Sequence, residues 1–255
     1  MAGAIARGIL SSGLCRPGDL IAADRHQATL DKLSRETGLS MAGSNSAAAA
    51  GADVVLLCVK PQDVAAAIAE AGGGLASKIL ISIVAGLATT RLEELAPGAR
   101  VVRAMPNTGA SVGRSATAIA PGQTATEADS DLAEKIFGAV GKVFRVSERD
   151  MNAITALSGS GPAFIYLVLE AMADGAVAAG LSRSLAHELA VETLAGAAET
   201  ADKIGYHPAV LREMVTSPGG TTIAGLLTLE KAAVRAAFAD AVRAAAVRAA
   251  ELSQH

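Results

Sequence analysis

Hydrophobic residues in the first 145 positions come in short runs that alternate with amphipathic stretches. Helical spacing of apolar residues is clearest at 26–37 and 126–140. The runs at 52–61 and 78–86 are continuously apolar, which is typical of parallel strands covered on both faces. The alternation predicts an α/β domain with a parallel, Rossmann-like sheet over residues 1–148. Six runs are short enough for β-strands: 19–24, 52–61, 78–86, 100–107, 115–122 and 142–147.

The pattern changes after residue 148, where the strand-like runs stop. Val234, Phe238 and Val242 recur every four residues and give the last helix an apolar face. That face either packs on the domain's own core or pairs with a second subunit, and the pattern leaves both open. Residues 149–255 are predicted to form an all-helical domain with helices at 151–180, 182–205, 208–215 and 222–252.

Composition and charge narrow the class of protein. Hydrophobic residues make up 51% of the chain and aromatic residues only 2%, so the predicted core is aliphatic and rich in alanine. The 22 Lys and Arg against 25 Asp and Glu give a net charge of −3 without a basic run. This balance argues against nucleic acid or a membrane surface as a partner. Cys15 and Cys58 fit a reducing compartment better than a disulfide scaffold.

The apolar stretch 151–169 has to be tested as a membrane span. It is interrupted by SGSGP and carries the hydroxyl groups of Thr155, Ser158 and Ser160, which a spanning helix tolerates poorly. The stretch is therefore predicted to be a buried helix of a soluble protein. Arg7 lies inside the apolar N-terminal segment and argues against a signal peptide, so a cytoplasmic location is predicted.

Charged residues follow two of the predicted strands. Asp24 ends the run 19–24, at the position where a Rossmann fold meets the adenosine ribose of a dinucleotide. Its carboxylate suits the ribose hydroxyls of NAD, whereas Arg25 suits the 2′-phosphate of NADP; a simple helix cap is the alternative. Val59, Lys60 and Pro61 follow the second apolar strand, and Lys60 either senses a cofactor phosphate or hydroxyl or is an exposed strand-end lysine.

The strand at 100–107 ends in Met105, Pro106 and Asn107. In a Rossmann-like strand order these residues lie beside a nicotinamide, where the Asn107 amide can both donate and accept hydrogen bonds. The sequence PNTG is equally typical of a turn, and the two interpretations are compatible.

The strongest local signal is VTSPGGTTIAGLLTLE at 215–230. Ser217, Gly219 and Gly220 form a tight loop, and Thr221 and Thr222 stand where a helix cap is expected. Free backbone N–H groups and the positive end of the helix dipole converge there, so the loop is either a carboxylate or phosphate site or a capped helix start.

Other catalytic patterns are not found. The four histidines have no metal-binding spacing, and G-x-S-x-G and Cys/His signatures are lacking, so no metal is predicted.

Together these stretches resemble the Δ1-pyrroline-5-carboxylate reductase family over essentially the whole chain. The matching segments are VKP, MPNT, LSGSGPAF, EAMADGAV and, above all, VTSPGGTTIAGLLTLE. The resemblance implies a Rossmann-like domain, a helical dimerisation domain, and NAD(P)H-dependent reduction of 1-pyrroline-5-carboxylate to L-proline at a site shared between subunits. It leaves open whether NADH or NADPH is preferred and whether dimers assemble further.

The resemblance also implies roles for individual residues. The substrate is surrounded by Glu148 and the loop of Ser217, Gly219, Gly220, Thr221 and Thr222, with Thr221 beside the ring nitrogen as the catalytic residue. The substrate reacts as an iminium that receives hydride from the nicotinamide, without a metal. Residues that the resemblance places at the cofactor are Met1, Asp24, Arg25, Asn45, Cys58, Val59, Lys60, Pro61, Ala85, Met105 and Asn107.

The first residues depart from the family pattern. The family opens with a strand and GxGNM, and its third small residue corresponds to Ala2, so Met1 takes the position just before it. The resemblance therefore implies a sheet with a gap, an exposed edge and weakened cofactor binding.

Two other functions remain as alternatives. A β-hydroxyacid dehydrogenase requires a lysine on the helix after the domain junction, and none lies between Met151 and Asp202. A truncated, weakly active or non-catalytic helical dimer is the second alternative, supported only by the N-terminal departure.

Overall fold

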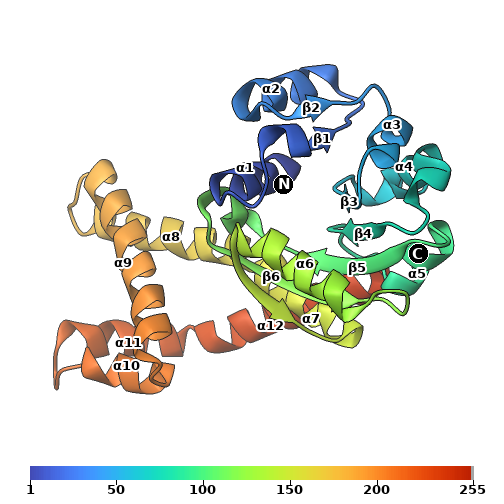
Figure 1. Ribbon diagram of the computed structural model, residues 1–255. Helices are drawn as coiled ribbons and strands as arrows, with labels where there is room; N and C mark the ends of the chain where they lie inside the picture. The colour runs from blue at the N-terminus through green and yellow to red at the C-terminus, as the bar shows by residue number, and fades with distance from the viewer. Residues whose placement is uncertain (254–255) are drawn as a thin grey trace. The chain divides into compact units, whose positions relative to one another are not determined.

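The computed structural model describes residues 1–253, which form two compact units. The first unit contains Met1–Ser160 and the segment from Arg243 onward, and the second is Gly161–Val242. Figure 1 shows strands in the first unit and helices alone in the second. The predicted α/β class with a following helical region is confirmed.

The main sheet of the first unit has the strand order β3-β4-β5-β6-β7. All neighbours are parallel except β5 and β6, which are antiparallel. Two further short strands, β1 (Ile21–Ala22) and β2 (Ser40–Met41), form a separate parallel pair. Every predicted strand region overlaps one of these strands, and only β2 was not predicted. The five strands are β3 (Val54–Leu57), β4 (Ile79–Ser82), β5 (Arg100–Met105), β6 (Ser115–Pro121) and β7 (Gly141–Arg145).

Helices cover both faces of the central strands, as the continuous apolar runs predict. On one face Ile81 of β4 and Val102 of β5 are buried with Ile5 and Phe137, which belong to α1 and α6. On the other face Leu80 and Val101 are buried against α4 and α5. Alternate residues thus point to opposite helical layers. The helices of this unit are α1 (Ala2–Ser11), α2 (Gln27–Thr37), α3 (Asn45–Ala50), α4 (Val64–Ala71), α5 (Thr89–Leu95), α6 (Glu127–Gly138) and α7 (Met151–Ile154).

The expected gap in the sheet is present between β1 and β3. The Ile79 N–H bonds to the Asp53 carbonyl, and the Ile83 N–H bonds to the Leu57 carbonyl. The backbone groups of Val54 and Leu56 therefore point to the opposite edge, because successive residues of a strand alternate in direction. Within residues 1–253, β3 pairs only with β4 and β1 only with β2.

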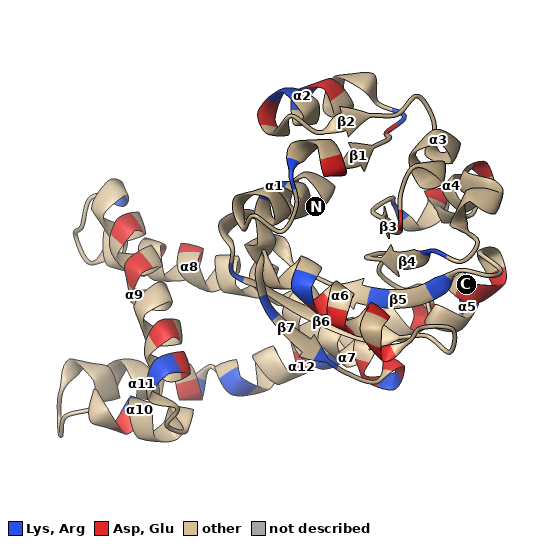
Figure 2. Cartoon of the chain, viewed as in Figure 1, with Lys and Arg blue, Asp and Glu red and all other residues tan. Residues whose placement is uncertain are grey.

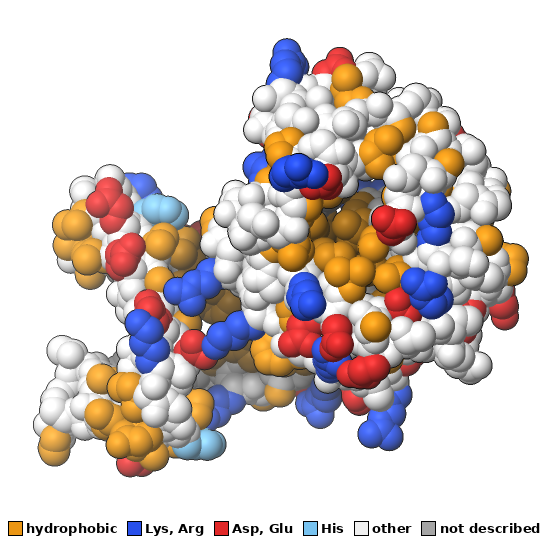
Figure 3. All heavy atoms as spheres, viewed as in Figure 1, with side chains coloured by type: hydrophobic (Ala, Val, Ile, Leu, Met, Phe, Trp, Pro, Cys, Tyr) orange, Lys and Arg blue, Asp and Glu red, His pale blue; other side chains and the backbone are white. Residues whose placement is uncertain are grey.

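The second unit is built from helices. Its buried apolar cluster consists of the small residues Ala173, Ala186 and Ala190, where α8 and α9 pack together. Larger apolar side chains are exposed, among them Tyr166 and Leu167 at 61% and 66%. Figure 3 shows hydrophobic side chains gathered at the surface over α10 and α11. The helices are α8 (Gly161–Ala178), α9 (Arg183–Ile204), α10 (Pro208–Met214) and α11 (Thr221–Lys231), and α12 (Val234–Leu252) starts in this unit.

Three predictions about the helical region were wrong. The stretch 151–180 is divided into α7, a π-turn at Thr155–Gly159 and α8. The stretch 222–252 breaks where Ala233 adopts a φ of 54°. The stretch 151–169 was predicted to be a buried helix, but most of its residues are exposed or only half-buried.

The run Glu148–Ala178 is long and apolar enough to cross a membrane by length and composition, with a mean hydropathy of 1.3 over an 18-residue window. Only 6% of that window is buried.

Gly141 begins β7 with a φ of 154°, a conformation that L side chains rarely adopt. A Cβ at this position would lie 2.1 Å from the Ser115 carbonyl oxygen, whereas a Cβ at Gly138 of α6 would meet no atom within 4 Å. We expect Gly141→Ala to lower the free energy of unfolding by at least about 2 kcal/mol. Gly138→Ala is the control, and it is expected to be neutral or stabilising by up to about 1 kcal/mol. Urea unfolding of both variants tests this, and equal effects would contradict it.

Candidate functional site

Most predicted cofactor residues lie at the carboxyl ends of strands. Cys58, Val59 and Lys60 follow β3, Ala85 lies beyond β4, and Met105 ends β5. Because β3, β4 and β5 are parallel, these ends share one edge of the sheet, where open α/β sheets bind ligands.

A cavity of about 540 Å³ lies at the end of β1. Asp24 lines this cavity, and its Oδ1 accepts a hydrogen bond of 2.8 Å from the His26 N–H. Asp24 therefore supports the turn before α2 but does not cap that helix, whose N-cap is His26 without a side-chain hydrogen bond, so the cap interpretation was wrong. Its second carboxylate oxygen remains for another donor. The remaining lining residues are Ala2, Gly3, Arg7, Ala22, Ala23, Thr29, Leu30, Lys32, Leu33 and Glu36.

Arg25 does not line this cavity. Its guanidinium donates two hydrogen bonds of 2.8 and 2.9 Å to the Asp63 carboxylate. Asp63 ends the short 3-10 helix η2 (Pro61–Asp63), which Pro61 starts and Lys60 precedes as the N-cap. Lys60 itself is exposed.

Two further predicted cofactor residues, Asn45 and Cys58, have surroundings that the structure defines. The Asn45 backbone N–H and Nδ2 donate to the Glu70 carboxylate at 3.2 and 2.8 Å. Desolvation raises the pKa of the Cys58 thiol to about 12, against a smaller opposite effect of the Met1 ammonium. Cys58 is therefore a neutral thiol at physiological pH.

The end of β5 contacts the π-turn. The Asn107 Nδ2 donates to the Ser158 carbonyl at 3.1 Å, and its Oδ1 accepts from the Gly109 N–H at 3.0 Å. A Cβ at Gly159 would lie 2.6 Å from the Met105 Cε, so the glycine permits this close approach. Asn107 thus builds the turn that the PNTG sequence predicts, and π-turns of this kind are frequent at functional sites.

Arg103, near the middle of β5, is a residue that sequence reasoning missed. Its side chain is only 2% exposed, and its Nη1 donates to the Glu148 Oε1 at 2.6 Å. The Arg103 Nε and Nη2 and the Glu148 Oε2 are buried and have no hydrogen-bond partner. The available signal is an arginine inside the apolar run VVRAM, a residue type that is almost never fully buried unless it is paired.

The loop of the second unit requires its glycines. Gly219 has a φ of 66°, and a Cβ at Gly220 would lie 2.3 Å from the Ser217 Oγ. The N-cap of α11 is Gly220, so the prediction that Thr221 and Thr222 occupy the cap position was wrong by one residue. No side chain caps the helix, which leaves its first N–H groups open to a ligand.

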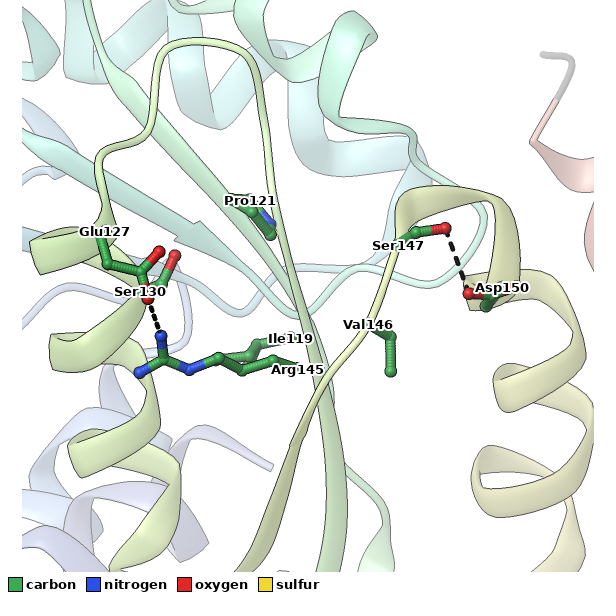
Figure 4. Close-up of a pocket in the computed structure, with 8 residues that line it drawn as sticks. All are labelled: Ile119, Pro121, Glu127, Ser130, Arg145, Val146, Ser147 and Asp150. Carbon is green, nitrogen blue, oxygen red and sulfur yellow. Dashed lines mark hydrogen bonds and ion pairs between the residues drawn. The ribbon is translucent and has the colours of Figure 1, made fainter.

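None of the predicted site residues lines a second cavity, of about 460 Å³, although Ser147 and Asp150 on either side of Glu148 do (Figure 4). Its one cation, Arg145, forms ion pairs with Glu127, Asp131 and Glu134. The carboxylates outnumber the arginine, so this cavity does not suit an anionic cofactor or substrate. It is lined by Ile119, Pro121, Glu127, Ser130, Arg145, Val146, Ser147 and Asp150.

Outside these cavities the charged residues of both signs are interspersed. Figure 2 shows acidic and basic residues interspersed on both units. No group of three or more His, Cys, Asp or Glu residues that could hold a metal occurs within residues 1–253.

Two family models match the chain. Residues 148–252 match the family described as pyrroline-5-carboxylate reductase dimerisation, and residues 1–86 match NADP oxidoreductase coenzyme F420-dependent.

Relatives and solved structures match over almost the full length. The chain is 45% identical to the pyrroline-5-carboxylate reductase of Arabidopsis thaliana, over 100% of the chain and 92% of that protein. The Coxiella burnetii pyrroline-5-carboxylate reductase structure has a TM-score of 0.92 and 37% identity, with 99% of this chain and 94% of that one covered. The NADP-bound pyrroline carboxylate reductase structure of Plasmodium falciparum has a TM-score of 0.89 and 31% identity, with 98% of this chain and 93% of that one covered. The chain therefore belongs to the pyrroline-5-carboxylate reductase family.

Proposed function

We propose that this chain reduces 1-pyrroline-5-carboxylate to L-proline with NADH or NADPH, the last step of proline biosynthesis. The observation that carries the proposal is the match to named reductases from end to end, at 45% identity in the first of them. The predicted cofactor residues at the strand ends and the uncapped glycine loop supply the two kinds of binding site that this reaction needs.

The cofactor site fits a dinucleotide. Asp24 offers a free carboxylate oxygen at the cavity beside β1, and small residues such as Ala2 and Gly3 permit close approach there. When bound, the nicotinamide supplies the hydride. The cofactor residues proposed from the resemblance are Met1, Asp24, Arg25, Asn45, Cys58, Val59, Lys60, Pro61, Ala85, Met105 and Asn107.

The glycine loop is the proposed carboxylate site. Ser217, Gly219 and Gly220 bring open backbone N–H groups to the positive end of the α11 dipole, where an anion is stabilised. Binding the carboxylate fixes the ring carbon that accepts hydride, since orientation alone removes much of a reaction barrier. Thr221 and Thr222 add hydroxyl groups, and Thr221 hydrogen-bonds the ring nitrogen as its positive charge disappears.

Glu148 is the proposed substrate residue in the first unit. Its carboxylate is held by Arg103, and one oxygen of the carboxylate lacks a partner. Arg103 is buried and Glu148 is half-buried, and an ion pair with such a buried guanidinium and unfilled hydrogen bonds is a poor source of stability compared with apolar side chains of similar size. The pair is therefore better explained by a role in binding than by a role in folding.

The helical region supports an oligomeric enzyme, and a cytoplasmic location is proposed with it. Residues 149–255 are proposed as the dimerisation and substrate domain, and residues 1–148 as the cofactor domain. The large apolar side chains left exposed in the second unit need a second surface, which the match to a dimerisation family indicates. In this proposal a homodimer buries these side chains, and no membrane or nucleic acid is a partner. Dimers are further proposed to assemble into a larger oligomer.

Thr221→Ala tests the catalytic assignment. A hydrogen bond to a group that changes charge contributes about 1.5–3 kcal/mol, so we expect kcat/KM with 1-pyrroline-5-carboxylate to fall about 10- to 100-fold. Thr228→Ala is the control on the same helix, because the Thr228 hydroxyl only bonds back to the Ala224 carbonyl. NADPH oxidation measures both variants. Unchanged kcat/KM in Thr221→Ala removes this role, and folded wild-type protein without activity argues for a non-catalytic dimer.

A second prediction concerns the effect of the Arg103–Glu148 ion pair on stability and on substrate binding. Glu148→Met leaves a buried guanidinium without its counter-charge and is expected to cost about 3–5 kcal/mol of unfolding free energy. The double variant Arg103→Met, Glu148→Met should recover most of that loss. Its KM for the substrate should nevertheless rise about tenfold or more, with the dissociation constant of the cofactor unchanged. A double variant with wild-type KM would show that the pair has no role in substrate binding.

A further inference from the structure

Asp24 and Arg25 are neighbours at the end of β1 with opposite charges, and their side chains lie in different surroundings. Asp24 lines the 540 Å³ cavity, while Arg25 is not among its lining residues. A carboxylate suits the 2′- and 3′-hydroxyls of NADH, and a free arginine suits the 2′-phosphate of NADPH. The position of Arg25 therefore bears directly on cofactor choice.

Asp63 holds Arg25 in a two-point contact. Both guanidinium–carboxylate hydrogen bonds are shorter than 3 Å, which is the fork geometry that also binds phosphate. The acceptor is placed by the backbone, since Pro61 fixes the first residue of η2, with three residues between it and the end of β3. The Asp63 side chain is 23% exposed and that of Arg25 is 67% exposed, so the contact competes with solvent.

The other cations at the cavity are also paired. Arg7 lies 3.0 Å and Lys32 lies 3.9 Å from the Glu36 carboxylate. The charged groups that line the cavity are thus Arg7, Lys32, Glu36 and Asp24, and they sum to zero. A ribose with two hydroxyl donors fits this surface, whereas a 2′-phosphate meets the Asp24 carboxylate and no unpaired cation.

We propose that Asp63 determines cofactor preference by holding Arg25 away from the 2′-phosphate, which biases the chain toward NADH. The inference rests on the proposed function, because it assumes that the cavity takes the adenosine ribose. An exposed ion pair is weak, so the bias is modest and a single substitution at Asp63 shifts it.

Calorimetric titration of the full chain with NADH and NADPH tests the proposal without turnover. Asp63→Asn frees Arg25, and the dissociation constant for NADPH is expected to fall about three- to tenfold, with that for NADH changed less than twofold. Asp31→Asn is the matched control, since it removes the same charge from α2, where the Asp31 carboxylate accepts a hydrogen bond from the Gln27 Nε2. The control should leave both constants within twofold.

The background variant Arg25→Gln separates release of the arginine from loss of a negative charge. In that background Asp63→Asn should have no effect on NADPH binding beyond twofold. An effect of the same size with and without Arg25, or no effect of Asp63→Asn on the NADPH constant, overturns the inference. Wild-type protein that binds neither dinucleotide overturns the proposed function as well, so the two failures are distinguishable.

Discussion

The ion pair between Arg103 and Glu148 ties the central strand of the sheet to the segment that follows it. Arg103 is buried on β5, and Glu148 begins the run that leads through α7 and the π-turn. Asn107, beyond the end of the same strand, binds the π-turn at Ser158. The segment after β7 is therefore held against β5 at two points. A charged contact in such a place is costly, and two guanidinium nitrogens and one carboxylate oxygen of the pair are buried without a hydrogen-bond partner.

Much of the first unit could be predicted because its signal is local. Continuous apolar runs fix β3, β4 and β5 as doubly covered strands, and their parallel order brings Lys60, Ala85 and Met105 to one edge. The strand β2 has two residues and exposed side chains, so no apolar pattern marks it. The break at Ala233 lacks glycine or proline, and an alanine sequence of helical propensity gives no reason to end a helix there.

The partners of the charged residues could not be predicted, because they are distant in sequence. Arg103 and Glu148 are separated by 45 positions, and Arg25 and Asp63 by 38. Sequence reasoning placed Asp24 and Arg25 together at a ribose, since both follow one strand. Only the tertiary structure shows that Asp24 lines the cavity and that Arg25 is held by the Asp63 carboxylate at the end of η2. The different surroundings of Asp24 and Arg25 therefore come from residues that are distant in sequence and close in space.

The second unit carries the proposed substrate loop on a scaffold with little core of its own. Three alanines are its buried apolar cluster, and a contact of such small groups cannot hold five helices by hydrophobic burial alone. Surface from a second subunit is the simplest source of the missing stabilisation, because leucine, methionine and tyrosine side chains are already exposed. The proposed substrate loop and the exposed apolar side chains thus belong to the same helices, which match a dimerisation family.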